Sequence, residues 1–208
     1  MEETENSWIN IADVMSALMM IFMFIAIAFM YQLQSEKEIY KIDLNKALHK
    51  EFDKDLNRWE AEITEDNIMR FNAPFESGSS ALPHKYNTIL YEFFPRYIKV
   101  LTLKQFKDEI SEIRVEGHTS YGWGEKTSNK DIYINNMNLS QKRASNVLSY
   151  CYLLKDKIII DNIKWIQTNL RANGMAFSNL LYKDKEEKIQ DKEKSRRVEF
   201  KVVTRDHF

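Results

Sequence analysis

The sequence predicts an α+β protein with one N-terminal transmembrane helix, a helical stalk and a small β-α-β-α-β-β sandwich. An uncharged apolar run first fills residues 14–31. An apolar residue then recurs every three or four positions as far as residue 63, and beyond it short alternating segments are separated by helical patterns. We therefore divide the chain into a tail with its membrane helix (1–33), the stalk (34–63) and a globular domain (64–208).

The apolar run Val14–Tyr31 has the length of a single membrane crossing. Its eighteen residues form about 27 Å of helix at about 1.5 Å per residue, close to the hydrocarbon thickness of about 30 Å. The first ten residues hold three glutamates and no Lys or Arg, and no Ala-x-Ala site follows the run. Because a signal peptide needs a basic start and a small-residue cleavage site, we expect a retained anchor.

One ionisable residue, Asp13, lies at the edge of this run, and the residues alone leave two interpretations open. Asp13 could lie at headgroup depth and cap the helix, where unpaired N–H groups favour an anion. Alternatively, its carboxylate could carry an ion, because an acid within a membrane span is costly and commonly lines an ion pathway. Helical spacing places on one face Asp13, Ala17, Met20, Phe24 and Ile27.

The segment Gln34–Ile63 is predicted to continue the membrane helix, since it contains neither Pro nor Gly. Its apolar stripe has spacings of four, four, four, three and four and consists of Leu44, Leu48, Phe52, Leu56, Trp59 and Ile63. Such a narrow stripe suits a partner helix, for example a second copy of the chain in a dimer. The alternative is a single amphipathic helix that lies on its own domain.

The globular domain is predicted to contain short strands and two longer helices. Strands are expected at 67–71, 113–117, 163–166 and 197–203, and helices at 83–103 and 139–154. Pro83 suits the first turn of a helix, where a missing N–H costs nothing, and Pro95 is expected to bend the same helix. Loops rich in turn-forming or charged residues are expected at 72–82, 118–138 and 171–194.

The composition argues against several function classes. The 30 basic and 31 acidic residues nearly cancel, so no electrostatic argument favours direct nucleic-acid binding. The single cysteine, Cys151, cannot form an intrachain disulfide. The sequence offers no nucleophile–base–acid arrangement and no phosphate loop, and His118 is interpreted as a lone turn residue without a cluster of Cys or carboxylates. We therefore expect a protein that is not an enzyme and holds no metal or cofactor.

Three local sequences together resemble the OmpA-like peptidoglycan-binding domain. They are V-E-G-H-T at 115–119, N-L-S-Q-K-R-A at 138–144 and S-R-R-V-E at 195–199. The family carries V-x-G-H-T-D, N-x-x-L-S-x-x-R-A and N-R-R-V-E at these places, and residues 71–82 resemble its F-x-x-G-S-x-x-L segment. The resemblance covers residues 64–203 and implies the sandwich fold of that family and binding to peptidoglycan.

The resemblance also implies which residues contact the stem peptide of peptidoglycan. Arg143 matches the arginine that grips a peptide carboxylate, a task that suits the two parallel charged hydrogen bonds of a guanidinium. The family's Asp, which holds the ammonium of diaminopimelate, is Ser120 here. The loop 121–136 is longer than in the family and is expected to supply substitutes. The implied peptidoglycan-binding residues are Thr119, Ser120, Tyr133, Asn135, Asn136, Leu139, Arg143 and Arg197.

An OmpA-like domain behind one membrane helix resembles the flagellar stator subunit MotB. The run D-V-M-S-A-L-M-M at 13–20 is similar to the A-D-x-M-x-A-M-M segment of that family, in which the Asp carries the ion. The chain is short for a flagellar MotB and has an unusual entry at residues 8–13. It resembles more closely the ZorB family, the stator-like membrane subunits of the Zorya anti-phage defence system. Both resemblances imply that Asp13 is the ion carrier.

The ZorB resemblance implies a homodimer inside a pentamer of a MotA- or ZorA-like membrane subunit, with H⁺ or Na⁺ as the coupling ion. It implies an inner-membrane protein with a cytoplasmic N-terminus and a periplasmic domain bound to peptidoglycan. Counted alone, the lysines at 37, 41, 46 and 50 favour the opposite orientation. Rival interpretations are a flagellar stator subunit, a passive OmpA-like anchor, and a TolR- or ExbD-like energy transducer, which lacks the second and third motifs.

Overall fold

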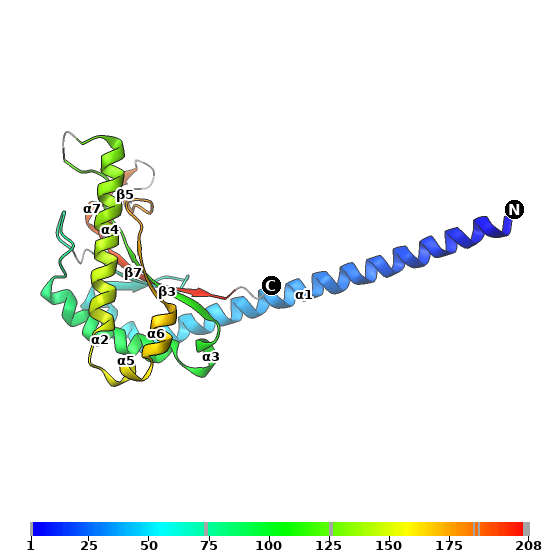
Figure 1. Cartoon of the computed structure of the whole chain (residues 1–208), viewed down its shortest axis with the longest axis horizontal. Coiled ribbons are helices and arrows are strands. Elements are labelled where there is room, and N and C mark those ends of the chain that lie inside the picture. The colour runs from blue at the N-terminus through cyan, green and yellow to red at the C-terminus, as the bar shows by residue number, and fades with distance from the viewer. Residues whose placement is uncertain (1, 73–74, 125–126, 185, 187, 206–208) are drawn as a thin grey trace. The chain divides into compact units, whose positions relative to one another are not determined.

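The computed structural model describes residues 2–72, 75–124, 127–184, 186 and 188–205. It divides into two compact units, one that ends at Ile42 and one that begins at Asp43. Figure 1 shows the helices and strands with the labels used below.

The first unit consists of the N-terminal part of helix α1 (Glu2–Trp59). This part contains an 18-residue window of mean hydropathy 2.4, and none of that window is buried inside the chain. Side chains from Ile11 to Gln32 are exposed all round the helix. A helix that is apolar on every side needs lipid or other helices around it. The predicted apolar helix is confirmed, and it is long and apolar enough to cross a membrane once.

The remainder of α1, from Asp43 to Trp59, belongs to the second unit. Leu44, Leu48, Phe52 and Trp59 are buried there, and the rings of Phe52 and Trp59 lie 5.3 and 6.1 Å from that of Phe93. Of the two interpretations of this stripe, the structure shows the helix that lies on its own domain. The segment 34–63 is thus divided between the two units, and its residues from Asp43 onward belong to the second.

The helix also ends earlier than expected, at Trp59 rather than Ile63. Glu60 adopts a left-handed backbone (φ 53°), which stops the helix, and strand β1 (Ala61–Ile63) follows. A periodic stripe does not reveal such a stop because Ile63, the last member of the stripe, keeps helical spacing while it lies in a strand.

A five-stranded sheet forms the centre of the second unit, in the order β1-β2-β7-β3-β4. Its other strands are β2 (Ile68–Phe71), β7 (Val198–Thr204), β3 (Ile110–Gly117) and β4 (Leu170–Gly174). Strands β3 and β4 are parallel, and the other pairs are antiparallel. A separate small hairpin consists of β5 (Tyr182–Asp184) and β6 (Ile189–Gln190).

Six further helices accompany the sheet in the described part of the chain. They are α2 (His84–Leu101), α3 (Lys104–Lys107), α4 (Asn129–Tyr152), α5 (Lys157–Asp161), α6 (Ile163–Asn169) and α7 (Lys192–Ser195). Helix α4 packs on β3 and β4 and also contacts α2 (Figure 1). The aromatic ring of Phe200 on β7 lies 5.1 Å from Phe93 of α2 and 6.0 Å from Phe71 of β2. The α+β class is confirmed, with helices packed over one sheet.

Three predicted elements differ from the structure. The loop expected at 171–194 starts within β4, contains β5 and β6, and ends within α7. Residues 163–166 form the start of helix α6, and the strand follows at 170–174. A short apolar run has no periodicity long enough to separate a strand from a buried helix, and Ile166 is buried in the helix. Helix α4 begins at Asn129, not at 139, because the Ser128 side chain accepts the Asp131 amide and caps it.

Candidate functional site

Two parallel strands of the sheet end side by side, where Gly117 of β3 pairs with Gly174 of β4. A Cβ atom on Gly117 would lie 2.2 Å from the Ser140 carbonyl oxygen, and one on Gly174 would lie 2.7 Å from the Gln141 nitrogen. Both strand ends therefore require glycine, since any side chain would push helix α4 away. This close approach brings the middle of α4 directly over the edge of the sheet.

Polar side chains of α4 fasten the helix to this edge. The Ser140 hydroxyl accepts the Ala176 amide at 2.9 Å, and the Gln141 side chain accepts the Gly174 amide at 2.7 Å. The same Gln141 amide donates to the Ala172 carbonyl at 3.0 Å. Within the motif over 138–144, Ser140 and Gln141 therefore hold the helix in place, which fixes the direction in which Leu139 and Arg143 project.

A cavity of about 410 Å³ opens beside this helix, between the loop after β3, the loop before α2 and the region of α7. Its lining includes Thr119, Ser120, Asn136, Leu139 and Arg143, which the sequence had singled out, and also Ser77, Gly78, Tyr121, Gly122, Trp123, Gly124, Lys192 and Arg196. The structure therefore brings five of the eight peptidoglycan-binding candidates to one cavity.

The other three candidates lie outside the lining. Tyr133 is exposed on α4, with its ring 6.0 Å from that of Phe177, and Asn135 is half-buried on the same helix. These residues were expected in a long loop, but the early start of α4 places them on a helix. Asn136 lines the cavity, and its side-chain amide donates to the carbonyls of Ile132 and Gly122.

Arg143 is fully buried and holds three backbone carbonyl groups. Its Nε donates to Ser79 at 2.8 Å, Nη2 donates to Glu76 at 2.8 Å, and Nη1 donates to His118 at 3.3 Å. The guanidinium also lies over the Phe75 ring at 5.0 Å. Burial and the charge of Arg196 lower the pKa of Arg143 to about 10. Since a guanidinium has five N–H donors, two remain for a ligand in the cavity.

Two further polar atoms of the cavity lack partners. Thr119 Oγ1 and Arg196 Nε are both buried, and neither has a hydrogen-bond partner among the described residues. Buried polar atoms are nearly always paired, so an unpaired pair of atoms in one cavity indicates a place for a ligand or for water. Arg196 was missed as a site residue because the sequence does not show which of two adjacent arginines faces the cavity.

The neighbouring Arg197, a sequence candidate, is not brought to the cavity. Its side chain is 2% exposed, and its Nε donates to Glu199 Oε1 at 2.6 Å. Arg70 Nε donates to the same oxygen at 2.6 Å. The alternation of β7 could have predicted this, since Arg197 and Glu199 are two positions apart and share a face.

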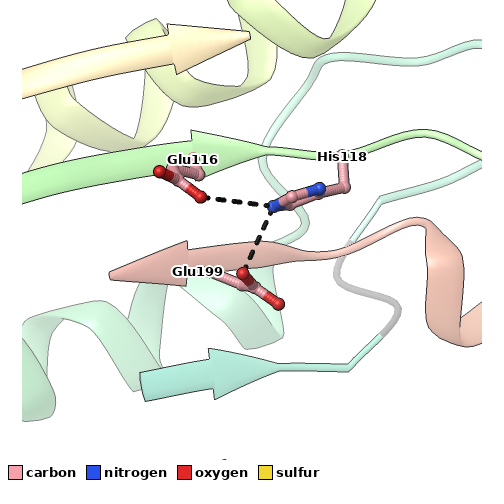
Figure 2. A group of neighbouring side chains, drawn as sticks. All are labelled: Glu116, His118 and Glu199. Atoms are coloured by element: carbon pink, nitrogen blue, oxygen red, sulfur yellow. Dashed lines mark ion pairs between the residues drawn. The ribbon is translucent and has the colours of Figure 1, made fainter. Parts of the chain in front are cut away.

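His118 is not a lone residue, contrary to expectation. Figure 2 shows its Nε2 directed at two buried carboxylates, with Glu199 Oε2 at 3.3 Å and Glu116 Oε2 at 3.8 Å. Burial raises the pKa of Glu199, but the contact with His118 and the charge and hydrogen bond of Arg197 outweigh it, so the pKa lies well below its usual range. The sequence separates Glu116 from Glu199 by a long stretch of chain, which hid this cluster.

These three side chains could also offer ligand atoms to a metal ion, since those atoms lie within 4.8 Å of one another. Two guanidinium groups already contact Glu199, however, so a dication would lie beside two positive charges. The cluster is best described as a buried polar network, in which Arg70 and Arg197 pair with Glu199 at the end of β3 and the start of β7.

The domain that contains this cavity matches a known family. Residues 74–193 match the model described as the OmpA family. Along almost its whole length, the chain is 41% identical over 218 residues to the protein described as Zorya protein ZorB from Escherichia coli strain Crooks. The match covers 98% of this chain and 90% of that protein. The chain therefore belongs to the OmpA family and, within it, to the ZorB proteins.

Solved structures give a coarser likeness. A putative MotB-like protein from Desulfovibrio vulgaris is 18% identical with a TM-score of 0.47, covering 80% of this chain and 97% of that one. The cell wall anchor of the type VI secretion system from Pseudomonas aeruginosa is 16% identical with a TM-score of 0.47, covering 76% and 97%. The family assignment depends on the two sequence matches above.

Proposed function

We propose that this chain is the wall-anchored subunit of a proton- or sodium-driven rotary membrane motor that acts in anti-phage defence. The observation that carries the proposal is the combination, in one chain, of an apolar helix with an acid at its edge and an OmpA-family cavity. The likeness to Zorya protein ZorB along nearly the whole chain supports the defence role.

The C-terminal domain binds peptidoglycan through the cavity beside α4. Arg143 shapes the cavity and offers its two remaining donors, Thr119 and Ser120 contribute hydroxyl groups, and Leu139 and Asn136 form the wall. Tyr133 and Asn135 are close in sequence to Asn136 and extend the contact along α4. Arg197 acts indirectly, because its hydrogen bond to Glu199 holds the start of β7, which follows directly after Arg196 and Arg197.

Asp13 carries the coupling ion through the membrane. When H⁺ or Na⁺ neutralises the carboxylate, its desolvation penalty falls and the helix can move past its neighbours. Release on the other side restores the charge and its attraction to polar groups of a partner. Each elementary charge that crosses is worth about 2.3 kcal/mol per 100 mV of membrane potential, and the wall-bound domain resists the resulting torque.

This mechanism defines the partners and the location of the chain. Two copies sit inside a pentamer of a MotA- or ZorA-like membrane subunit, with the N-terminus in the cytoplasm and the domain in the periplasm. The proposal assigns no catalytic step to this chain and no direct contact with nucleic acid. The buried stripe of α1 leaves the dimer contact to the part of the helix before Asp43, where the exposed apolar surface lies.

The wall-binding half of the proposal is tested by co-sedimentation of the full-length protein, in detergent, with purified sacculi. We expect retention that Arg143→Ala weakens, while the adjacent exposed residue changed in Lys142→Ala serves as a charge-matched control. If the same amount of wild-type protein sediments with and without sacculi, wall binding is refuted.

A flagellar stator subunit is the second candidate, and it differs in one measurable way. Such a subunit restores swimming to a strain that lacks its own stator, whereas a defence subunit restores only protection from phage. Asp13→Asn is expected to abolish that protection while the complex still assembles. Full protection by this variant would instead favour a passive wall anchor.

A further inference from the structure

Three aromatic side chains gather on the surface where the segments after β3 and β4 meet the first turns of α4. The Phe177 ring lies 5.1 Å from that of Tyr121 and 6.0 Å from that of Tyr133, with interplanar angles of 88° and 85°. Tyr121 and Tyr133 are 47% and 48% exposed, and Phe177 is half-buried. We call these three residues the aromatic platform. Single apolar residues are ordinary on a protein surface, whereas a contiguous group of them marks an interaction site.

The backbone next to the platform is held in an unfavourable conformation. Ala176, directly before Phe177, is buried and has a left-handed backbone (φ 47°), which is costly for a residue with a Cβ atom. Its amide donates to the Ser140 hydroxyl at 2.9 Å, and its carbonyl accepts the Thr119 amide at 2.8 Å. Strain that surrounding groups maintain in this way is concentrated at functional sites. Here it fixes the point at which Phe177 leaves the sheet.

The platform is continuous with the cavity beside α4. Tyr121 belongs to the platform and also lines the cavity. The Asn136 amide, close to Tyr133 on α4, donates to the Gly122 carbonyl at 3.3 Å and joins the helix to the loop that carries Tyr121. Peptidoglycan consists of glycan strands that carry peptide branches. If a branch enters the cavity, its strand lies outside, at the rim that the platform forms.

The platform has the chemistry of a site for a sugar ring. None of its three side chains carries a charge, and the face of an aromatic ring has a negative electrostatic potential. The pyranose rings of a glycan strand expose C–H groups, whose hydrogens are weakly positive, and these pack on such a face. Tyrosine suits this contact because its large rigid ring loses little conformational entropy when it is fixed.

We propose that Tyr121 and Tyr133 bind the glycan strand of peptidoglycan by stacking against its sugar rings. Phe177 is a positioning residue, because its ring contacts both tyrosines and holds them in place. This inference rests on the proposed wall binding and adds a contact with the saccharide part of the wall, separate from the cavity that takes the peptide.

The test uses glycan strands freed of their peptides with an amidase, labelled with a fluorophore at the reducing end, and the full-length protein in detergent. Binding is followed by fluorescence anisotropy, and we expect it to be saturable. Unlabelled chitotetraose, an N-acetylated saccharide without a carboxylate, should displace the strands. Displacement shows that the sugar is recognised and not the lactyl carboxylate that the amidase exposes.

Variants separate the rings from the rest of the surface. Tyr121→Ala and Tyr133→Ala should each raise the Kd for the strands by at least about fivefold, because each removes one stacking ring. Tyr133→Phe keeps the ring and should stay within about twofold of wild type. Tyr91→Ala removes an exposed tyrosine from α2, outside the platform, and should leave the Kd unchanged.

Four results overturn the inference. The strands fail to bind while sacculi still retain the protein, or chitotetraose does not displace them. Alternatively, the double variant Tyr121→Ala/Tyr133→Ala binds the strands as tightly as wild type, or it has a lower molar mass than wild type in light scattering, which would make the platform a contact between copies of the chain. If sacculi do not retain the wild-type protein, the wall-binding proposal itself fails.

Discussion

The Nε of Arg143 lies 2.8 Å from the carbonyl oxygen of Ser79, although 64 residues separate the two in sequence. Together with the Glu76 contact at 2.8 Å, this bond ties the middle of α4 to the loop that precedes α2. The arginine therefore has two tasks, since it shapes the wall of the cavity and also faces its interior.

Loss of this side chain should affect stability as well as binding. Arg143→Ala leaves three carbonyl groups without their charged donor, and we expect the free energy of unfolding to fall by about 2–4 kcal/mol. Arg143→Lys should recover part of the stability because it keeps a charged donor. The recovery should be incomplete because an ammonium can reach fewer of these carbonyls. Denaturant titration of both variants measures their free energies of unfolding. If Arg143→Ala loses no more stability than the exposed control Lys142→Ala, these bonds contribute nothing.

The contact between β3 and α4 gives a second prediction. Gly117→Ala places a methyl group 2.2 Å from the backbone oxygen of Ser140, and backbone cannot rotate away as a flexible side chain does. We expect destabilisation of about 3 kcal/mol or more and reduced sacculus binding, because α4 shifts. A thermal scan of the variant, compared with wild type, checks this; an unchanged unfolding midpoint would mean that the helix is not held so closely.

The pH dependence of stability follows from Glu199. Its folded pKa lies below the ordinary value of 4.5, so the unfolded state binds the proton more readily. The stabilisation from this group is therefore complete above pH 4.5 and is lost as the pH falls toward the folded pKa.

We expect the stability of Glu199→Gln to depend less on pH below pH 4.5 than that of the wild type. We also expect its free energy of unfolding to be lower by about 3–5 kcal/mol, because Arg197 and Arg70 lose their shared carboxylate. The variant of exposed Glu65, Glu65→Gln, should keep the wild-type slope. Parallel slopes for all three proteins below pH 4.5 would contradict the described network.

The boundary of the domain gives a fourth prediction. A fragment that begins at Asp43 should fold, whereas one that begins at Thr64 should not, because it lacks Leu44, Leu48, Phe52 and Trp59. Each such buried side chain contributes about 2–5 kcal/mol, so their combined loss is about as large as the total stability of an ordinary domain, about 5–15 kcal/mol. Near-ultraviolet circular dichroism distinguishes the two outcomes, and a cooperative transition in the shorter fragment would refute the boundary.

The sequence allowed the apolar helix and the family fold to be predicted, because each depends on a local pattern. The run of eighteen uncharged residues can be recognised without knowledge of the tertiary structure. The three motifs lie where two strand ends and a helix meet. The contact between Gly117 and Ser140 joins two of these motifs in space, so the residue types that each motif needs are fixed by the other.

The remaining features depend on long-range packing and could not be predicted in the same way. The apolar stripe from Leu44 to Trp59 has the same sequence pattern whether it packs against a second copy of the chain or against its own domain. The cluster of Glu116, His118 and Glu199 forms only when β3 and β7 pair. Arg196 and Arg197 are adjacent, and their separation into a cavity residue and a buried ion pair depends on where β7 begins.

Ion flux through the complex reconstituted with its membrane partner in liposomes tests the motor mechanism most directly. Wild type and Asp13→Glu should conduct H⁺ or Na⁺ when a gradient is imposed, because both keep a carboxylate at the edge of the membrane helix. Asp13→Asn should reduce the flux by at least about tenfold, since an amide cannot be charged and discharged. Equal flux through Asp13→Asn and wild type would contradict the account.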